Sequence, residues 1–113
     1  LLARYPNLHY DISTGEPGRR YACTGGLDTV IWQDGSFGRQ RDKLKPAYKD
    51  ILTRFSGRFV VGFDFGASNR KSASFLRGRI ANVRLILRDL ADAAKHDIGY
   101  RNAWKLLTGK DWR

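Results

Sequence analysis

The sequence predicts a parallel α/β fold, and three features support this class. Residues 8–13 alternate apolar and polar side chains, which is the period of a β-strand. A helical pattern begins at Pro46, and the run 59–63 that comes after it is continuously apolar, as in a parallel strand buried on both faces. A strand, a helix and a second buried strand in succession are typical of parallel α/β structure.

The segment between the first strand and the first helix is mostly loop in composition. Residues 5–7 have turn chemistry and precede the strand, and residues 14–18 contain two glycines and a proline. Gly25-Gly26 marks a second break. Residues 28–32 are either a short strand or a helical turn, and residues 38–45 are charged and predicted to be a loop.

The first helix is predicted to begin at Pro46, because proline at the first helical position loses no hydrogen bond. Gly57 is suited to the position just past the helix end. The second strand, 58–64, follows at once, and residues 66–74 form a polar loop. The apolar residues at helical spacing are Leu44, Tyr48, Ile51, Leu52 and Phe55.

Two further helices are predicted, one over about 74–95 and one over about 98–107. Asp97 is expected to cap the last helix and Gly109 to end it. The long helix has one apolar and one basic stripe. The apolar stripe is Leu76, Ile80, Val83, Leu87, Leu90 and Ala94, and the basic stripe is Arg77, Arg84, Arg88 and Lys95. The core contacts expected of the last helix are Ala103, Trp104 and Leu107.

Composition restricts the class of protein. The 113 residues are enough for one small domain, and the single Cys23 excludes an intramolecular disulfide. No apolar run approaches the roughly 18 residues of a membrane span. Residues 1–6 lack the basic-then-apolar order of a signal peptide, which favours the cytoplasm, and the missing initiator methionine suggests a fragment or a processed product.

The net charge of +10 indicates attraction to polyanions. Residues 70–113 have eleven Lys and Arg against four Asp and Glu, so most of the excess lies there. The basic stripe of a surface helix explains this pattern without a partner. The sequence has no zinc-ligand cysteines, no basic zipper heptads and no RNA-recognition aromatic strand, so a nucleic-acid partner is the lesser interpretation.

Asp64 is the best candidate for chemistry, because it ends the most apolar strand in the chain. A carboxylate at a strand end is partly desolvated and can bind a metal ion or act as a base. The alternative is a structural Asp that caps the next segment or pairs with an arginine. His9 and Asp11 share one strand face but make only half of a metal site, and helix-end electrostatics explains His96.

Several segments then resemble one family, the metal-dependent amidohydrolase family of TIM barrels. Residues 5–13, YPNLHYDIS, resemble its "YPNVYYDLS" strand. Residues 34–35 and 44–49, DG and LKPAYK, resemble its "DG…LKPEW" stretch that leads into a helix. Residues 58–64, RFVVGFD, are similar to "DRFVLGSD". The segments come in the family's order along the chain.

The end of the chain extends the resemblance, since Ile98 and residues 101–107, RNAWKLL, are similar to the closing "I…NAxRLL" helix. The resemblance implies that residues 1–113 are the C-terminal part of a (β/α)8 barrel, with strands seven and eight and their helices. It implies that Asp64 contacts a divalent metal ion, with zinc the expected one, and helps to activate its water. The family's histidine ligands would come before Leu1, so the chain alone is expected to bind no metal tightly and to be inactive.

Two departures and two alternatives accompany this interpretation. The basic insert 38–43 and Arg70-Lys71 differ from the family pattern. Arg70 could hold an anionic small-molecule substrate at the site mouth, although a solvated loop charge is the simpler explanation. The chain could instead be a stand-alone basic module for nucleic acid or an acidic partner. It could also be a truncated barrel that forms homo-oligomers through exposed strand edges.

Overall fold

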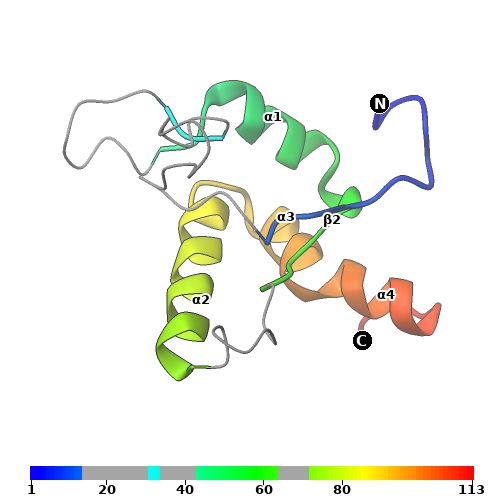
Figure 1. Ribbon diagram of the computed structural model, residues 1–113. Coiled ribbons are helices and arrows are strands. Elements are labelled where there is room, and N and C mark those ends of the chain that lie inside the picture. Colours follow the sequence, from blue (N-terminus) through cyan, green and yellow to red (C-terminus); the bar gives the residue numbers. More distant parts are fainter. Residues whose placement is uncertain (14–30, 34–42, 64–71) are drawn as a thin grey trace, which may run out of the picture.

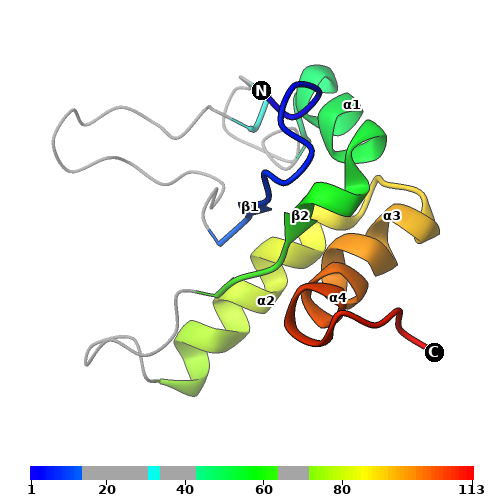
Figure 2. The same cartoon turned by 90° about the vertical axis from the view of Figure 1, so that its right-hand side faces the viewer.

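The computed structural model describes residues 1–13, 31–33, 43–63 and 72–113. In these ranges the chain forms two short strands and several helices (Figure 1). Strand β1 (Tyr10–Asp11) lies beside strand β2 (Phe59–Val60), and helix α1 (Pro46–Arg54) comes between them in the sequence. Figures 1 and 2 agree that the strands lie toward one face of the molecule and that the helices α3 (Asp92–His96) and α4 (Asn102–Thr108) lie behind them.

The two strands pair in parallel, as the order strand, helix, strand predicts. Tyr10 is in register with Phe59 and Asp11 with Val60. One further hydrogen bond, from the N–H of Ile12 to the carbonyl of Val60 at 3.0 Å, extends the pairing past β1. Both strands are shorter than the predicted 8–13 and 58–64, because regular pairing covers only the centre of each extended segment.

Helix α1 begins at Pro46, as predicted, and ends at Arg54, three residues before Gly57. Gly57 lies in a single 3-10 turn, η2 (Ser56–Arg58), which leads directly into β2. Ahead of α1, an isolated antiparallel bridge joins Trp32 to Leu44. Residues 28–32 were predicted to be a short strand or a helical turn, and the bridge shows that the chain is extended at Trp32. Trp32 and Leu44 are both buried.

The predicted long helix over 74–95 is wrong. Helix α2 (Ala73–Leu87) begins with the Ser72 side chain accepting a hydrogen bond from the Phe75 N–H at 3.1 Å, and it ends about eight residues early. The chain then turns, and α3 (Asp92–His96) starts after Ala91, whose backbone is extended. Leu90 lies in the turn and is buried, so the change of direction brings it into the core.

From α3 the chain continues helically through a π-helical turn, η4 (Asp97–Arg101), into α4 (Asn102–Thr108). Asp97 therefore does not cap the last helix. Its carboxylate accepts a hydrogen bond from the Ser56 hydroxyl at 3.1 Å and pairs with Arg101 at 3.5 Å. Gly109 ends α4 in the left-handed conformation, with φ of 70°, as predicted.

The core gathers where the strands meet α1, α2 and the α3–η4 run. Its most buried member, Ile98, has no exposed surface. Two of the three predicted core contacts of the last helix are wrong, because Trp104 is 40% exposed and Leu107 is 86% exposed, whereas Ala103 is partly buried. The buried cluster consists of Trp32, Leu44, Leu52, Phe59, Ile86, Leu90, Ala94 and Ile98.

Two parallel strands with a connecting helix are common to many α/β folds, so the barrel itself remains a prediction. Among the described residues, no helix combines the length and the apolar character needed to cross a bilayer.

Candidate functional site

The two faces of the strand pair differ in what they contact. Tyr10 and Phe59 are opposite each other in the register, and their rings stack with centroids 6.0 Å apart. Both rings line an apolar cleft of about 540 Å³. Tyr48 and Ile51 of α1 line it as well, as does Phe55, the residue that follows α1. This face is therefore the one that the first helix covers.

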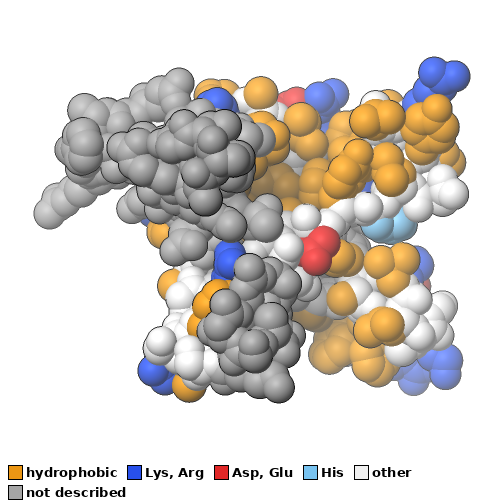
Figure 3. Space-filling view, in the orientation of Figure 1, with side chains coloured by type: hydrophobic (Ala, Val, Ile, Leu, Met, Phe, Trp, Pro, Cys, Tyr) orange, Lys and Arg blue, Asp and Glu red, His pale blue; other side chains and the backbone are white. Residues whose placement is uncertain are grey.

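Asp11 lies on the opposite face, because successive side chains of a strand point to opposite sides. Its carboxylate is directly over Gly62, and a Cβ added at Gly62 would overlap it. Asp11 thus crosses from the end of β1 to the segment that follows β2. Figure 3 shows acidic and histidine side chains between hydrophobic ones on the face of the molecule seen in Figure 1. Glycine at position 62 is what leaves room for the carboxylate.

Arg79 brings a positive charge to the same end of the strands. Its Nη1 donates to the carbonyl of Ser13 at 3.2 Å, and its guanidinium lies 4.9 Å from the centroid of the Phe75 ring. We call these residues, Asp11, Ser13, Gly62 and Arg79, the carboxyl edge. Arg79 is off the basic stripe of α2, so the sequence analysis missed it. The only indication in the sequence was that Arg79 lies one helical turn before Asn82, a polar residue that the structure buries.

The predicted site residues are divided between described and undescribed parts of the chain. Asp64 and Arg70 lie outside the described residues, as does Cys23. His9 lies one residue before β1, and its buried Nδ1 has no hydrogen-bond partner among the residues that the structure describes. His96 is far along the chain in α3, with its ring 5.7 Å from that of Tyr100.

A metal centre needs at least three protein ligands. In the described ranges, no three His, Cys, Asp or Glu side chains gather to form one. His9 and Asp11 are two potential ligands near one strand end, but the described residues do not by themselves fit a metal ion.

The opposite end of the strands, where they begin, is held by side chains that bond to backbone carbonyls. Arg58 donates to the carbonyls of Tyr5 at 3.4 Å and Leu8 at 3.2 Å. Asn102 donates to the carbonyls of Ser56 at 2.7 Å and Phe59 at 2.8 Å. We call this end the amino edge. These hydrogen bonds explain why a polar residue, Arg58, stands directly before β2. They also explain why Asn102 stands one helical turn after the core residue Ile98.

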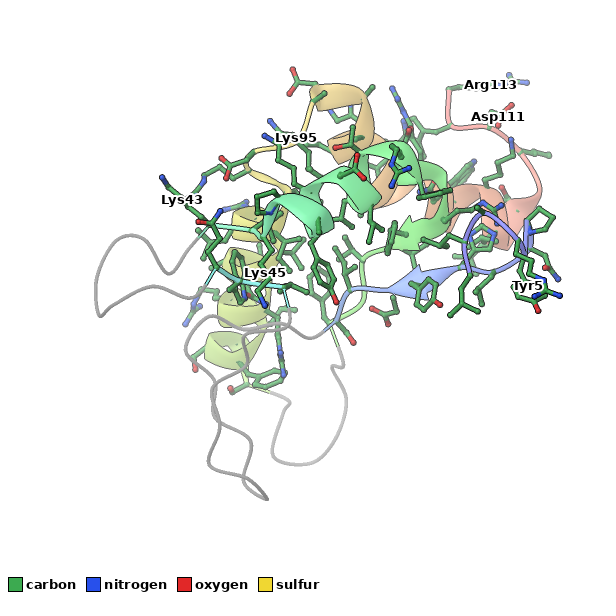
Figure 4. The ribbon with its side chains drawn as sticks, turned by 90° about the horizontal axis from the view of Figure 1, so that it is seen from above. Tyr5, Lys43, Lys45, Lys95, Asp111 and Arg113 are labelled. Atoms are coloured by element: carbon green, nitrogen blue, oxygen red, sulfur yellow. The ribbon has the colours of Figure 1, made fainter. Side chains whose placement is uncertain are left out.

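The charges elsewhere are mostly basic and solvated. Figure 4 shows Lys43 and Lys45 at the end of the molecule near the start of α1, away from Asp111 and Arg113 at the C-terminus. A hydrogen bond from Arg88 lowers the pKa of Asp89, and the charges of Lys49 and Lys43 act in the same direction. This environment attracts anions without forming an enclosed site.

No family model, curated protein or solved structure matches this chain. The resemblance to the amidohydrolase family thus rests on the sequence segments alone.

Proposed function

We propose that this chain is the C-terminal portion of a metal-dependent hydrolase of the amidohydrolase superfamily, in which Asp64 acts at the carboxyl edge. The observation that supports this most is the parallel pairing of β1 and β2. In parallel α/β proteins, functional groups gather where the strands end. Asp64 follows Phe63 directly in the sequence, two residues after the glycine that lies under the Asp11 carboxylate.

The proposed chemistry is hydrolysis of a small ester, lactone or amide. The Asp64 carboxylate accepts a proton from the attacking water, which makes that water a better nucleophile. Arg70 is proposed to hold an anionic group of the substrate.

The metal ion of this proposal depends on ligands that the described residues do not provide. The family's histidine ligands would belong to sequence preceding Leu1. In the proposed complete protein this chain supplies the strand-end carboxylate and the helices that cover the last two strands.

The test compares the 113-residue chain with a longer protein that includes the natural upstream sequence, both with added Zn²⁺ and an ester or lactone substrate. We expect hydrolysis by the longer protein only, and its loss in the Asp64→Asn variant. The matched control is Asp111→Asn, an exposed carboxylate in the C-terminal segment, which should leave the rate unchanged. Hydrolysis that is insensitive to Asp64→Asn, or absent from the longer protein, would overturn the proposal.

A further inference from the structure

The C-terminal segment places three large aromatic side chains together on the surface. Tyr100, Trp104 and Trp112 are 38%, 40% and 49% exposed. The rings of Tyr100 and Trp112 lie 5.1 Å apart and those of Trp104 and Trp112 lie 5.2 Å apart, both edge to face. We call these three rings the aromatic cluster. Such a cluster is larger than a single scattered apolar side chain and calls for an explanation.

The backbone is built to hold Trp112 in this cluster. Gly109 reverses the chain at the end of α4 with a positive φ. The Lys105 ammonium then bonds the Asp111 carboxylate at 2.8 Å, which anchors the returning segment against the helix. In an edge-to-face pair, the face of one ring meets the edge of the other. The exposed fractions of Trp104 and Trp112 thus leave ring surface available to another planar group.

Cations surround these rings. A cleft of about 770 Å³ is lined by Trp104 and Trp112 together with Lys110 and Arg113, and by Asp111, whose carboxylate is paired with Lys105. Arg101 lies 5.9 Å from the centroid of the Tyr100 ring. From residue 97 to 113 there are four Lys and Arg and two Asp, and the whole chain is at +10. Aromatic rings and positive charges thus line the same recess.

We propose that the aromatic cluster and its cations bind single-stranded nucleic acid without sequence preference. Bases stack on the exposed faces of Trp104 and Trp112, and Lys110 and Arg113 contact the phosphates. Stacking platforms beside a basic groove are how such proteins tolerate every base, because each base has a planar face. Binding without sequence preference does not require the zinc-ligand cysteines, zipper heptads or RNA-recognition strand that this sequence lacks. The proposed binding surface is also independent of the proposed hydrolase site.

A membrane surface is the competing occupant, because Leu106 and Leu107 are also exposed on α4. An anionic bilayer would take up these leucines and leave the recess between the tryptophans unused. Positive charge attracts nucleic acid and an anionic membrane alike. The recess lined by Trp104 and Trp112 favours nucleic acid, because a planar base can stack there.

The test titrates the chain with a 20-nucleotide poly-dT strand at low ionic strength and follows tryptophan fluorescence. We expect quenching, and a binding constant whose logarithm falls linearly with the logarithm of salt concentration. Trp112→Ala should weaken binding roughly 5- to 150-fold, which is the range for loss of one stacked base. Trp104→Phe keeps a ring and should stay close to the parent chain. An absence of binding, or equal binding by Trp112→Ala, would overturn the proposal.

Matched variants separate this surface from general charge. Lys110→Ala/Arg113→Ala removes two cations from the recess, and Lys43→Ala/Lys45→Ala removes two at the other end of the molecule (Figure 4). We expect the first pair to weaken binding markedly more than the second, and equal effects would refute the site. Tighter binding to anionic vesicles, lost on changing Leu106 and Leu107 to Ser, would assign the surface to membranes instead. Asp64→Asn should bind poly-dT normally, so this test and the hydrolase test fail independently.

Discussion

The two edges of the strand pair are built differently. At the amino edge, Arg58 and Asn102 each donate to two backbone carbonyls, and the buried Ile98 lies next to this edge. At the carboxyl edge, the described residues form one such bond, from Arg79 to Ser13, and a carboxylate lies over a glycine. This contrast is the one expected of parallel α/β proteins, in which one end of the strands maintains stability and the other is left for function.

The largest expected effect comes from the core beside the amino edge. Ile98→Ala should lower the free energy of unfolding by about 2–5 kcal/mol, because it leaves a cavity at a side chain with no exposed surface. Urea denaturation measures this. Leu107→Ala is the control, since that side chain is 86% exposed and its loss should cost well under about 0.5 kcal/mol. Equal costs for the two variants would contradict the observed packing of the last helix.

The second effect compares the two edges directly. Asn102→Ala removes the amide donor to the carbonyls of Ser56 and Phe59, of which the Ser56 carbonyl keeps the Phe59 N–H, and we expect a loss of about 1–3 kcal/mol. Arg79→Met removes the bond to Ser13 but keeps an apolar stem beside Phe75, so its cost should stay below about 1 kcal/mol. If Arg79→Met proved the more costly change, the carboxyl edge would be the structural one.

The third effect tests the close approach of Asp11 to Gly62. Gly62→Ala should lower the free energy of unfolding by less than about 1 kcal/mol, because the new methyl group overlaps the Asp11 carboxylate but this exposed side chain can turn away. Adding Asp11→Ala should recover most of that loss, which is a non-additive coupling between neighbours. Gly57→Ala is the control, since nothing lies within 4 Å of a Cβ there and its cost should be close to zero. Additive losses at positions 11 and 62 would show that the two do not touch.

The smallest effect concerns the C-terminal segment. The hydrogen bond between Lys105 and Asp111 lowers the pKa of Asp111 below its ordinary 3.8 and raises the pKa of Lys105 above its ordinary 10.5. The contribution of Asp111 is therefore present above pH 3.8 and is lost as the pH falls through its lowered pKa. The contribution of Lys105 is present below pH 10.5 and is lost as the pH rises through its raised pKa.

Tryptophan fluorescence should report this change, because Trp112 follows Asp111 directly and contacts Trp104. We expect the signal to be flat between these limits and to shift at both extremes. Asp111→Asn should remove the acid transition while the rest of the chain unfolds as before. An unchanged acid transition in that variant would assign it to other carboxylates.

The sequence alone was sufficient for the features that depend on local chemistry. Proline at the first helical position starts α1 at Pro46, and glycine, which tolerates positive φ, ends α4 at Gly109. The order of strand, helix and apolar strand predicted the parallel pairing, because a helical crossover returns the chain in the same direction. The barrel, Asp64 and Arg70 remain predictions from the resemblance.

Only the tertiary structure decided the features that depend on distant contacts. The apolar spacing of Leu87, Leu90 and Ala94 continues through the turn between α2 and α3, so periodicity could not locate it. Trp104 has the spacing of a core residue, yet Trp112 returns to pack against it at the surface. Asp11 and Gly62 are 51 positions apart in the chain. Local patterns fix the conformation of a segment, whereas which face is buried and which side chains meet depend on the direction in which segments pack.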